Sequence, residues 1–218
     1  MLLLEERKKV VEYCRMLQTK NLTRGTGGNI SIYDRKNGLI AVSPSGVEYS
    51  VMKPEDVVIV DIDGNVVEGE MIPSSETGLH IAAYKANPTF NSVVHTHSAY
   101  ATMAACMGKD VPAVHYLIGF GGSDHIPCIP YYTYGSLELA AAAGRKYEEE
   151  QDIKVILLGN HGLLAGEESV EKAFAAADEI EFLCQIYVNL LQTGQMNILS
   201  QDDMKVVVKK FATYGQRK

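Results

Sequence analysis

The chain has 218 residues, which suits a single domain over residues 1–218 with one sizeable hydrophobic core. With 46% hydrophobic and 22% charged residues and no low-complexity tract, the composition predicts an ordinary globular fold and argues against disorder. The formal net charge is −7 and the lysines and arginines do not cluster, which argues against a surface for nucleic acid or anionic membranes.

The cysteines and the N-terminal residues favour a reducing, cytoplasmic location. The chain contains four cysteines that lie far apart and never in C-x-x-C spacing, Cys14, Cys106, Cys128 and Cys184. This pattern is typical of free, mostly buried thiols. The apolar residues Met1 to Leu4 are followed at once by Glu5, so the run is too short for a signal peptide. No other apolar run approaches the roughly 20 residues that a membrane-spanning helix needs.

The N-terminal part of the chain predicts one helix followed by several strands. Val10, Cys14 and Leu17 recur at helical spacing behind a charged face, which indicates an amphipathic helix from about Glu5 to Thr19. A glycine-rich loop then precedes the runs that we expect to form strands, residues 30–33, 39–43, 57–60 and 66–67. The last two should form a hairpin across the turn signal Asp63-Gly64.

The central part predicts a helix and then a buried strand. The helix should begin within residues 73–76, with serines as caps and Glu76 in its first turn, and should end before Pro88. Residues 91–97 have the apolar, β-branched composition of a buried strand. Glycines and prolines interrupt the apolar residues 111–133, which predicts short strands and loops there.

The C-terminal part predicts three helices around a further strand. We expect helices over residues 136–149 and 169–192, each with a serine as its cap, and a last helix over 200–215. The apolar residues 153–158 should form the strand. Strands with helices before, between and after them predict a three-layer α/β architecture.

Three histidines and one carboxylate form a candidate metal site. His95 and His97 are separated only by Thr96, and since side chains alternate along a strand, both imidazoles should point the same way. Glu76 lies near the start of the expected helix, and His161 directly follows an expected strand. This is the ligand set of a zinc site whose fourth position can be vacated for a substrate. We therefore interpret the chain as a zinc enzyme.

An H-x-H pair does not by itself establish a metal site, because two histidines on a half-buried strand can simply face solvent. Other metal folds fit less well: no D-H pair follows His97, no acid follows at cupin-like spacing, and TIM-barrel hydrolases need about 250 residues. The remaining histidines are expected to be packed or at the surface rather than metal ligands, namely His80, His115 and His125.

Three short motifs are candidates for binding phosphate. Gly27-Gly28-Asn29 precedes a strand, Ser45-Gly46 interrupts one, and Ser74-Ser75 stands at a helix N-terminus, where anions are favoured. Each alone is better explained as an ordinary turn or cap. None is a dinucleotide fingerprint or a Walker A loop, so a nucleotide site is not expected. If Glu76 reaches the metal, a small phosphorylated substrate would fit both groups of residues.

These motifs, taken in order, resemble those of the class II aldolase and L-ribulose-phosphate 4-epimerase family. The likeness extends over nearly the whole chain and rests on G-x-G-G-N at Gly25, P-S-G at Pro44, P-S-S-E at Pro73, H-T-H at His95 and N-H-G at Asn160. The resemblance implies an α/β/α fold with a central mixed, mainly antiparallel sheet. It also implies a homotetramer with active sites at subunit interfaces.

The resemblance further assigns roles to individual residues. It implies zinc bound by His95, His97 and His161, with Glu76 as the fourth ligand at rest and as the catalytic base once substrate displaces it. It implies that phosphate is held by Gly28, Asn29, Ser45, Gly46, Ser74 and Ser75.

Two tyrosines would complete the catalytic groups. By the same likeness, Tyr116 would enter a neighbouring subunit's site to protonate the aldehyde oxygen, and Tyr214 would close over the substrate. From the residues alone, Tyr116 stands among apolar neighbours and suits a core position, while Tyr214 suits a mobile terminus. The chain departs from the family pattern at Tyr134, where a phenylalanine is expected in the aldehyde pocket, and at Ser45, which replaces a threonine.

The expected reaction is cleavage of L-fuculose 1-phosphate, or a related ketose 1-phosphate, to dihydroxyacetone phosphate and L-lactaldehyde or another small aldehyde. Tyr116 and the C-terminal Tyr214 favour this aldolase activity. The same site is compatible with methylthioribulose-1-phosphate dehydratase or pentulose-5-phosphate 4-epimerase activity. A scaffold domain without catalysis, as in adducin, is the alternative from another class, but its signature would be lost metal ligands.

Overall fold

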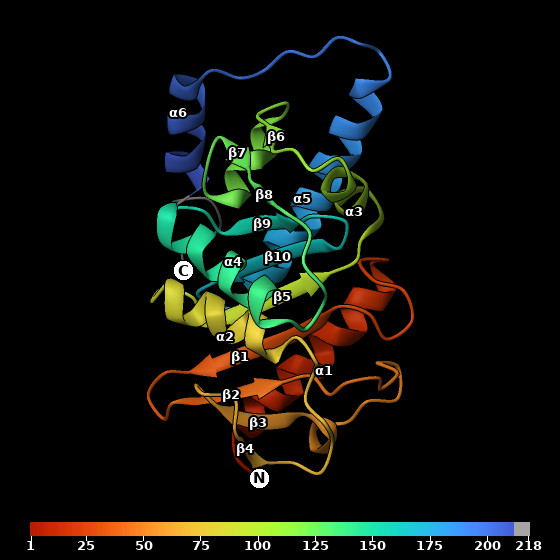
Figure 1. Cartoon of the computed structure of the whole chain (residues 1–218), viewed down its shortest axis with the longest axis vertical. Coiled ribbons are helices and arrows are strands. Elements are labelled where there is room, and N and C mark those ends of the chain that lie inside the picture. The colour runs from red at the N-terminus through yellow and green to blue at the C-terminus, as the bar shows by residue number, and fades with distance from the viewer. Residues whose placement is uncertain (212–218) are drawn as a thin grey trace.

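The computed structural model describes residues 1–211 and is built on an eight-stranded sheet of order β4-β3-β2-β1-β5-β10-β9-β8 (Figure 1). Its strands are β1 (Asn29–Asp34), β2 (Leu39–Val42), β3 (Val58–Asp61), β4 (Val66–Glu68), β5 (Ser92–Thr96), β8 (Cys128–Ile129), β9 (Val155–Leu158) and β10 (Gly162–Glu167). All neighbouring strands are antiparallel except β8 and β9. The expected mixed, mainly antiparallel sheet is thus confirmed.

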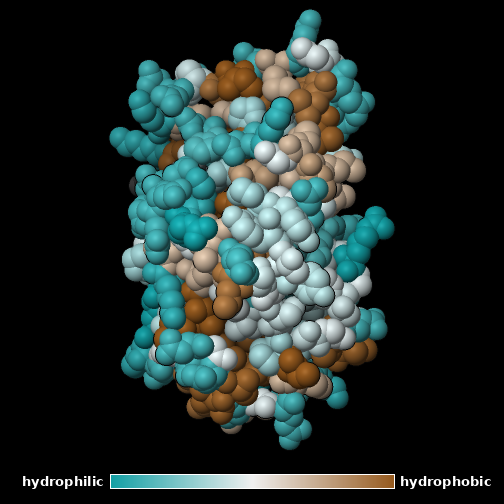
Figure 2. Space-filling view, viewed as in Figure 1, coloured by the Kyte–Doolittle hydropathy of each residue, from teal (hydrophilic) through white to brown (hydrophobic). Residues whose placement is uncertain are grey.

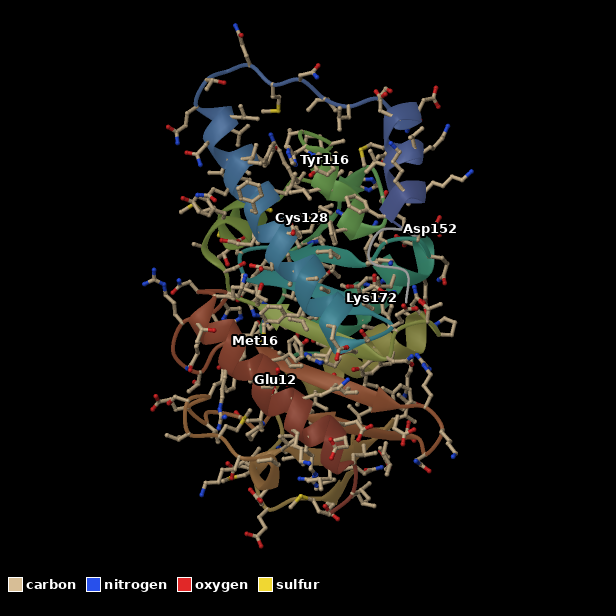
Figure 3. The ribbon with its side chains drawn as sticks, turned by 180° about the vertical axis from the view of Figure 1, so that it is seen from behind. Glu12, Met16, Tyr116, Cys128, Asp152 and Lys172 are labelled. Atoms are coloured by element: carbon tan, nitrogen blue, oxygen red, sulfur yellow. The ribbon has the colours of Figure 1, made fainter. Side chains whose placement is uncertain are left out.

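Helices cover both faces of the sheet. One face is covered by α2 (Thr77–Ala86) and α4 (Leu137–Glu149), and Figure 3 shows the opposite face crossed by α1 (Leu4–Thr19) and α5 (Val170–Leu191), with α3 (Ala99–Cys106) beside α5. The smaller elements are η1 (Pro54–Asp56), the ribbon of β6 (Val111–Pro112) and β7 (His125–Ile126), η2 (Tyr116–Gly121) and α6 (Gln201–Phe211). The expected three-layer α/β/α architecture is confirmed.

The central strand β5 separates two hydrophobic cores. Val94 packs with residues of α1 and α5, whereas its neighbour Val93 packs with residues of α2 and α4. Because strand side chains alternate, His95 lies on the same face as Val93, the face covered by α2. The strand therefore directs its histidine toward the start of the helix that carries Glu76.

Most of the expected elements appear within a few residues of their predicted bounds, but one strand and one α-helix were not predicted, nor were the short 3-10 helices η1 and η2. The strand β10 follows the turn after β9, and α3 follows β5 after a short connection. Two glycines, an alanine and a glutamate make β10 a poor strand former by composition. Gly166 is required there nevertheless, since a Cβ atom would lie 2.3 Å from the ring of Phe90.

Two local expectations were wrong. Glu76 is the N-cap residue of α2 rather than a residue of its first turn, and neither serine before it is the N-cap. Instead, the Ser74 hydroxyl accepts a hydrogen bond from the N–H of Glu76 at 3.2 Å. All four cysteines are free as expected, but only Cys14 and Cys184 are buried, and Cys106 is exposed.

The molecular surface is largely hydrophilic on the face shown in Figure 2. Hydrophobic areas lie toward both its upper and its lower end. Figure 1 places β4 at the lower end, and Val66, Val67 and Ile72 are exposed hydrophobic residues of β4 and the loop after it. Within residues 1–211, none of the helices combines the length and apolarity needed to cross a membrane.

Candidate metal centre and substrate pocket

Four side chains from different elements meet at one end of β5. His95 lies in β5, His97 directly follows it, His161 lies in the turn between β9 and β10, and Glu76 caps α2. Their ligand atoms all lie within 4.8 Å of one another. The structure thus brings together all four residues that the sequence nominates as metal ligands.

The distances among these atoms suit a small divalent cation. The Nε2 atom of His97 lies 2.8 Å from Nε2 of His95 and 3.1 Å from Nε2 of His161. The carboxylate oxygens of Glu76 lie 3.2 Å from His95 Nε2 and 3.3 Å from His161 Nε2. Ligand atoms around tetrahedral zinc, with bonds of about 2.0–2.1 Å, are about 3.3 Å apart. The residues present therefore fit a zinc ion.

Two further observations support a metal at this point. The Nδ1–H of His95 donates to the carbonyl oxygen of Leu163 at 2.8 Å, which leaves the Nε2 lone pair directed at the site. Within the described residues, Oε1 of Glu76 is buried and has no hydrogen-bond partner. A buried carboxylate oxygen without a partner is strongly unfavourable, and a bound cation would supply the missing interaction.

The protonation states of the four ligands depend on one another. Burial favours the neutral form of Glu76, but the neighbouring His95 outweighs burial and holds the pKa of Glu76 below its usual range. Burial likewise lowers the pKa of His95, but Glu76 outweighs it and raises that pKa. Burial, reinforced by the charge of His95, lowers the pKa of His97 to about 3 and that of His161 to about 4. Both are therefore neutral at pH 7, the form that binds a metal.

A cavity of about 350 Å³ opens beside these ligands. Its lining includes all the residues that the family resemblance assigns to phosphate, Gly28, Asn29, Ser45, Gly46, Ser74 and Ser75. Two of these turns are joined by an antiparallel bridge between Pro44 and Pro73. Residues about 30 positions apart in sequence therefore form one wall of the cavity.

The glycine-rich turn forms another part of the wall and passes very close to the histidines. Gly28 has a φ of +67°, and a Cβ atom on it would lie 2.7 Å from the carbonyl oxygen of His95. The Tyr49 hydroxyl donates to the Gly28 carbonyl at 2.6 Å and holds the turn in place. Glycine is required here both for the backbone conformation and for the close approach.

Asn29 has a contact that the sequence does not predict. Its side chain is buried, and its amide Nδ2 donates to Oε2 of Glu76 at 2.9 Å. A residue nominated for phosphate thus also holds the carboxylate at the metal site. The amide oxygen of Asn29 faces His80, which is buried as expected for a packed histidine, and burial lowers the pKa of His80 to about 3.

The three tyrosines proposed from the sequence differ in their positions. Tyr134 and Tyr131 line the cavity and are largely exposed, while Tyr132 also lines it but is partly buried against the core. Tyr131 and Tyr132 were not among the expected site residues. Tyr116 lies on η2 with 51% of its surface exposed, so it is not a core residue, and it does not line this cavity (Figure 3). Tyr214 lies outside the described residues.

The aromatic residues at the cavity mouth could have been found from the sequence. Tyr131, Tyr132 and Tyr134 come from one run directly after Pro130, in the segment where short strands and loops were expected. Tyrosines in a loop have no hydrophobic periodicity that would bury them, so their number in this run is itself a signal of a binding surface.

Comparisons with known proteins identify relatives that are aldolases, in agreement with the metal centre and the cavity beside it. Residues 8–188 match the model of the class II aldolase and adducin N-terminal domain. The chain is 48% identical, over the full length of both, to 5-deoxy-D-ribulose 1-phosphate aldolase of Bacillus thuringiensis serovar kurstaki. It is 39% identical to L-fuculose phosphate aldolase of Haemophilus influenzae, with 96% of this chain and 95% of the relative covered.

A solved structure also matches closely. An L-fuculose 1-phosphate aldolase superimposes with a TM-score of 0.88 at 35% identity, over 95% of this chain and 96% of the other. These relatives confirm the prediction of an aldehyde-lyase. The chain therefore belongs to the class II aldolase and adducin N-terminal domain family.

Proposed function

We propose that this protein is a zinc-dependent aldolase that cleaves a ketose 1-phosphate to dihydroxyacetone phosphate and a small aldehyde. The observation that carries the proposal is the Glu76 carboxylate, which has an unpartnered buried oxygen among three histidines and lies beside a cavity with several turns suited to phosphate. A scaffold protein would have no need to retain this complete ligand set.

The substrate proposed first is a deoxyketose 1-phosphate that ends in a methyl group. A relative at 48% identity is named for 5-deoxy-D-ribulose 1-phosphate, and one of Escherichia coli O45:K1 at 40% for 5-methylthioribulose 1-phosphate and 5-deoxyribulose 1-phosphate. L-Fuculose 1-phosphate, the substrate expected from the sequence motifs, also ends in a methyl group. The tyrosine rings of Tyr131 and Tyr134 at the cavity mouth suit such an apolar end.

In the cleavage direction, the bond between C3 and C4 of the ketose breaks and the aldehyde leaves. The zinc ion, when bound by the three histidines, would act as a Lewis acid that stabilises negative charge developing on the substrate oxygens. The protonated carboxyl group of Glu76 would then donate its proton to C3 of the three-carbon product, and the resulting carboxylate would remove that proton in the reverse direction.

The phosphate would be held by the turns of the cavity wall. Ser74 and Ser75 precede the N-terminus of α2, where the backbone dipole favours an anion. The N–H groups of Ser45 and Ser74 already donate to carbonyl oxygens of the chain, so their hydroxyls and the N–H groups of other wall residues would contact the phosphate. The phosphate end of the substrate thus lies next to the residue that moves the proton.

We also propose that Tyr116 acts in the site of a neighbouring subunit of a homotetramer. Its ring is half exposed, lies outside its own chain's cavity, and adjoins His115, which in turn contacts the exposed Phe182. In the cleavage direction, a phenolate at a subunit interface would take the proton of the C4 hydroxyl as the aldehyde forms, and in the reverse direction the phenol would donate this proton to the aldehyde oxygen.

A substrate panel tests the proposed activity. The purified protein is incubated with 5-deoxyribulose 1-phosphate, L-fuculose 1-phosphate and several ketose 5-phosphates, and release of dihydroxyacetone phosphate is measured. We expect release from the 1-phosphates with a terminal methyl group. Epimerisation of a pentulose 5-phosphate without cleavage of any 1-phosphate would show that the proposed activity is wrong.

Metal analysis tests the cofactor separately. We expect about one zinc ion per chain, loss of cleavage after chelation, and recovery when zinc is added. A protein that is fully active with far less than one metal ion per chain would contradict the proposed zinc dependence.

A further inference from the structure

A buried chain of hydrogen bonds leads from α2 through β1 to the Glu76 carboxylate. His80, which has no exposed surface, lies with Nε2 2.5 Å from Oδ1 of Asn29 and with Nδ1 2.6 Å from Oγ of Ser31. The Ser31 hydroxyl in turn lies 2.6 Å from the hydroxyl of Tyr84. Asn29 completes the chain through its hydrogen bond to Glu76.

The sequence spacing explains why these residues meet. Asn29 and Ser31 are two positions apart in β1, so their side chains lie on the same face of the sheet. His80 and Tyr84 are four positions apart in α2, so they lie on the same face of the helix. The strand pair faces the helix pair, and Glu76 lies one helical turn before His80.

The chemistry of the groups fixes the direction of every hydrogen bond. An ionised carboxylate can only accept, so the amide nitrogen of Asn29 donates to Glu76 and its amide oxygen accepts from His80. Nε2 of His80 must therefore carry a proton. A neutral imidazole has one N–H, so Nδ1 accepts from the Ser31 hydroxyl, and Ser31 accepts from Tyr84.

This chain of hydrogen bonds makes the two oxygens of Glu76 unequal. Both oxygens lie near a metal-binding imidazole, Oε2 at 3.2 Å from Nε2 of His95 and Oε1 at 3.3 Å from Nε2 of His161. Only Oε2 receives the N–H of Asn29, whereas Oε1 lacks a hydrogen-bond partner among the described residues. We propose that His80 is a positioning residue which, through Asn29, fixes the Glu76 oxygen beside His95 and leaves the other oxygen, beside His161, without a hydrogen bond and able to take the substrate proton. This inference rests on the proposed function, in which that carboxylate moves the substrate proton.

His80 exerts its effect by excluding the other orientation of the Asn29 amide. If the amide turned over, its oxygen would face Oε2 of Glu76, two acceptors at hydrogen-bond distance, and its NH₂ group would face the N–H of His80. Both contacts would be repulsive. Without the imidazole, one of these penalties disappears and the orientation of Asn29 is less well defined.

The position of His80 would suit a hydrocarbon side chain if packing alone mattered. His80 lies between Leu79 and Ile81 in a helix that packs on a hydrophobic core, and burying an imidazole there is unfavourable unless both nitrogens are paired. Both nitrogens are paired, and one of the partners connects directly to Glu76. Groups that hydrogen-bond to metal ligands commonly affect metal affinity or activity by about 10- to 100-fold.

Two substitutions at His80 test this role. His80→Phe keeps a ring but removes the donor to Asn29, while His80→Gln keeps an N–H donor and an acceptor. Tyr147→Phe serves as the matched control, since Tyr147 is equally buried and its hydroxyl donates to the backbone carbonyl oxygens of Leu164 and Lys154 rather than to a side chain of the site. For each variant we would measure the Zn²⁺ dissociation constant by chelator competition, and the exchange of the C3 proton of dihydroxyacetone phosphate with solvent deuterium.

We expect His80→Phe to slow the exchange about 10- to 100-fold, mainly in kcat rather than KM, and to weaken Zn²⁺ binding by about tenfold or more. His80→Gln should recover most of both losses. Tyr147→Phe should lower stability without changing either readout. Wild-type exchange and Zn²⁺ affinity in His80→Phe, or an equal loss in the control, would overturn the inference.

Failure of the positioning role and failure of the aldolase activity give different results. If the wild-type protein binds zinc but exchanges no proton, the proposed function is wrong, and the Zn²⁺ measurements alone still decide the role of His80. If His80→Phe does not fold, Ser31→Ala takes its place, because it removes the donor that selects the imidazole tautomer. Zn²⁺ affinity and exchange unchanged in Ser31→Ala would then overturn the inference.

Discussion

Gly27 lies directly against the imidazole of His97, so that a Cβ atom at this position would be only 2.7 Å from Nδ1 of the histidine. We therefore expect Gly27→Ala to displace the His97 ring from the other metal ligands. The Zn²⁺ affinity should fall by about tenfold or more, as for other changes that misorient a ligand. Competition with a chelator of known affinity measures the effect.

Gly78→Ala is the control for this change. Gly78 lies in α2 close to the site, but a Cβ atom there meets no neighbour within 4 Å and its φ is not positive. Alanine in a helix is favoured over glycine by about 0.5–1 kcal/mol, so this variant should be slightly more stable and bind Zn²⁺ normally. Equal loss of Zn²⁺ affinity in both variants would contradict the contact argument.

Glu76→Gln should separate substrate binding from proton transfer. The amide retains the size of the carboxylate but has no basic oxygen, so exchange of the C3 proton should fall by about 10²- to 10⁴-fold. The inhibition constant of inorganic phosphate should stay within a few-fold, since the wall turns remain intact. Exchange at the wild-type rate would remove Glu76 as the base.

Tyr116→Phe should abolish cleavage while leaving proton exchange close to normal, because only the aldehyde step uses the phenol. A mixed tetramer gives a sharper test. Subunits that carry Tyr116→Phe retain Glu76, and subunits that carry Glu76→Gln retain Tyr116. If the tyrosine serves a neighbouring site, refolding the two inactive variants together should restore part of the activity, and no recovery would argue that it acts elsewhere.

The burial of His80 predicts a pH dependence of stability in the metal-free protein. Its pKa is lowered from 6.5 to about 3 in the folded state. As the pH falls below 6.5, the unfolded chain binds a proton that the folded protein does not, so this residue destabilises the folded state progressively down to about pH 3. One such proton corresponds to about 1.4 kcal/mol per pH unit.

Urea unfolding of the wild type and of His80→Gln at pH 6 and pH 4.5 measures this contribution. Glutamine does not titrate, so the free energy of unfolding of the variant should fall less steeply with decreasing pH. The difference between the two slopes should correspond to the uptake of about one proton on unfolding. Parallel pH profiles for the two proteins would show that His80 is protonated equally in the folded and unfolded states.

Much of the site could be inferred from the sequence because its chemistry is concentrated in short motifs. Strand alternation predicts that His95 and His97 point the same way, and Glu76 and His161, at the ends of elements with clear composition, turn this pair into a candidate metal site. The strands around them are apolar and β-branched, so their periodicity is easily recognised. The match to the aldolase family agrees with the order of these motifs.

Other features could not be predicted because they depend on contacts between distant residues. The glycine-rich strand β10 owes its existence to pairing with β5 and β9 rather than to its own propensity. The role of His80 depends on Asn29, about 50 positions away in sequence. A histidine between two apolar helix residues has no sequence pattern that distinguishes a packed side chain from a positioning one.

The central place of β5 links the metal site to both halves of the sheet. On one side β5 pairs with β1, where Asn29 is opposite His95, and on the other with β10, where Leu164 is opposite the same histidine. The strand thus joins the N-terminal and C-terminal halves of the sheet. The turn between β9 and β10 supplies His161, and β1 supplies Asn29, which holds the ligand Glu76. Metal binding would therefore require that both halves of the sheet are folded and paired through β5. A tightly bound ion would in turn stabilise the association of the two halves.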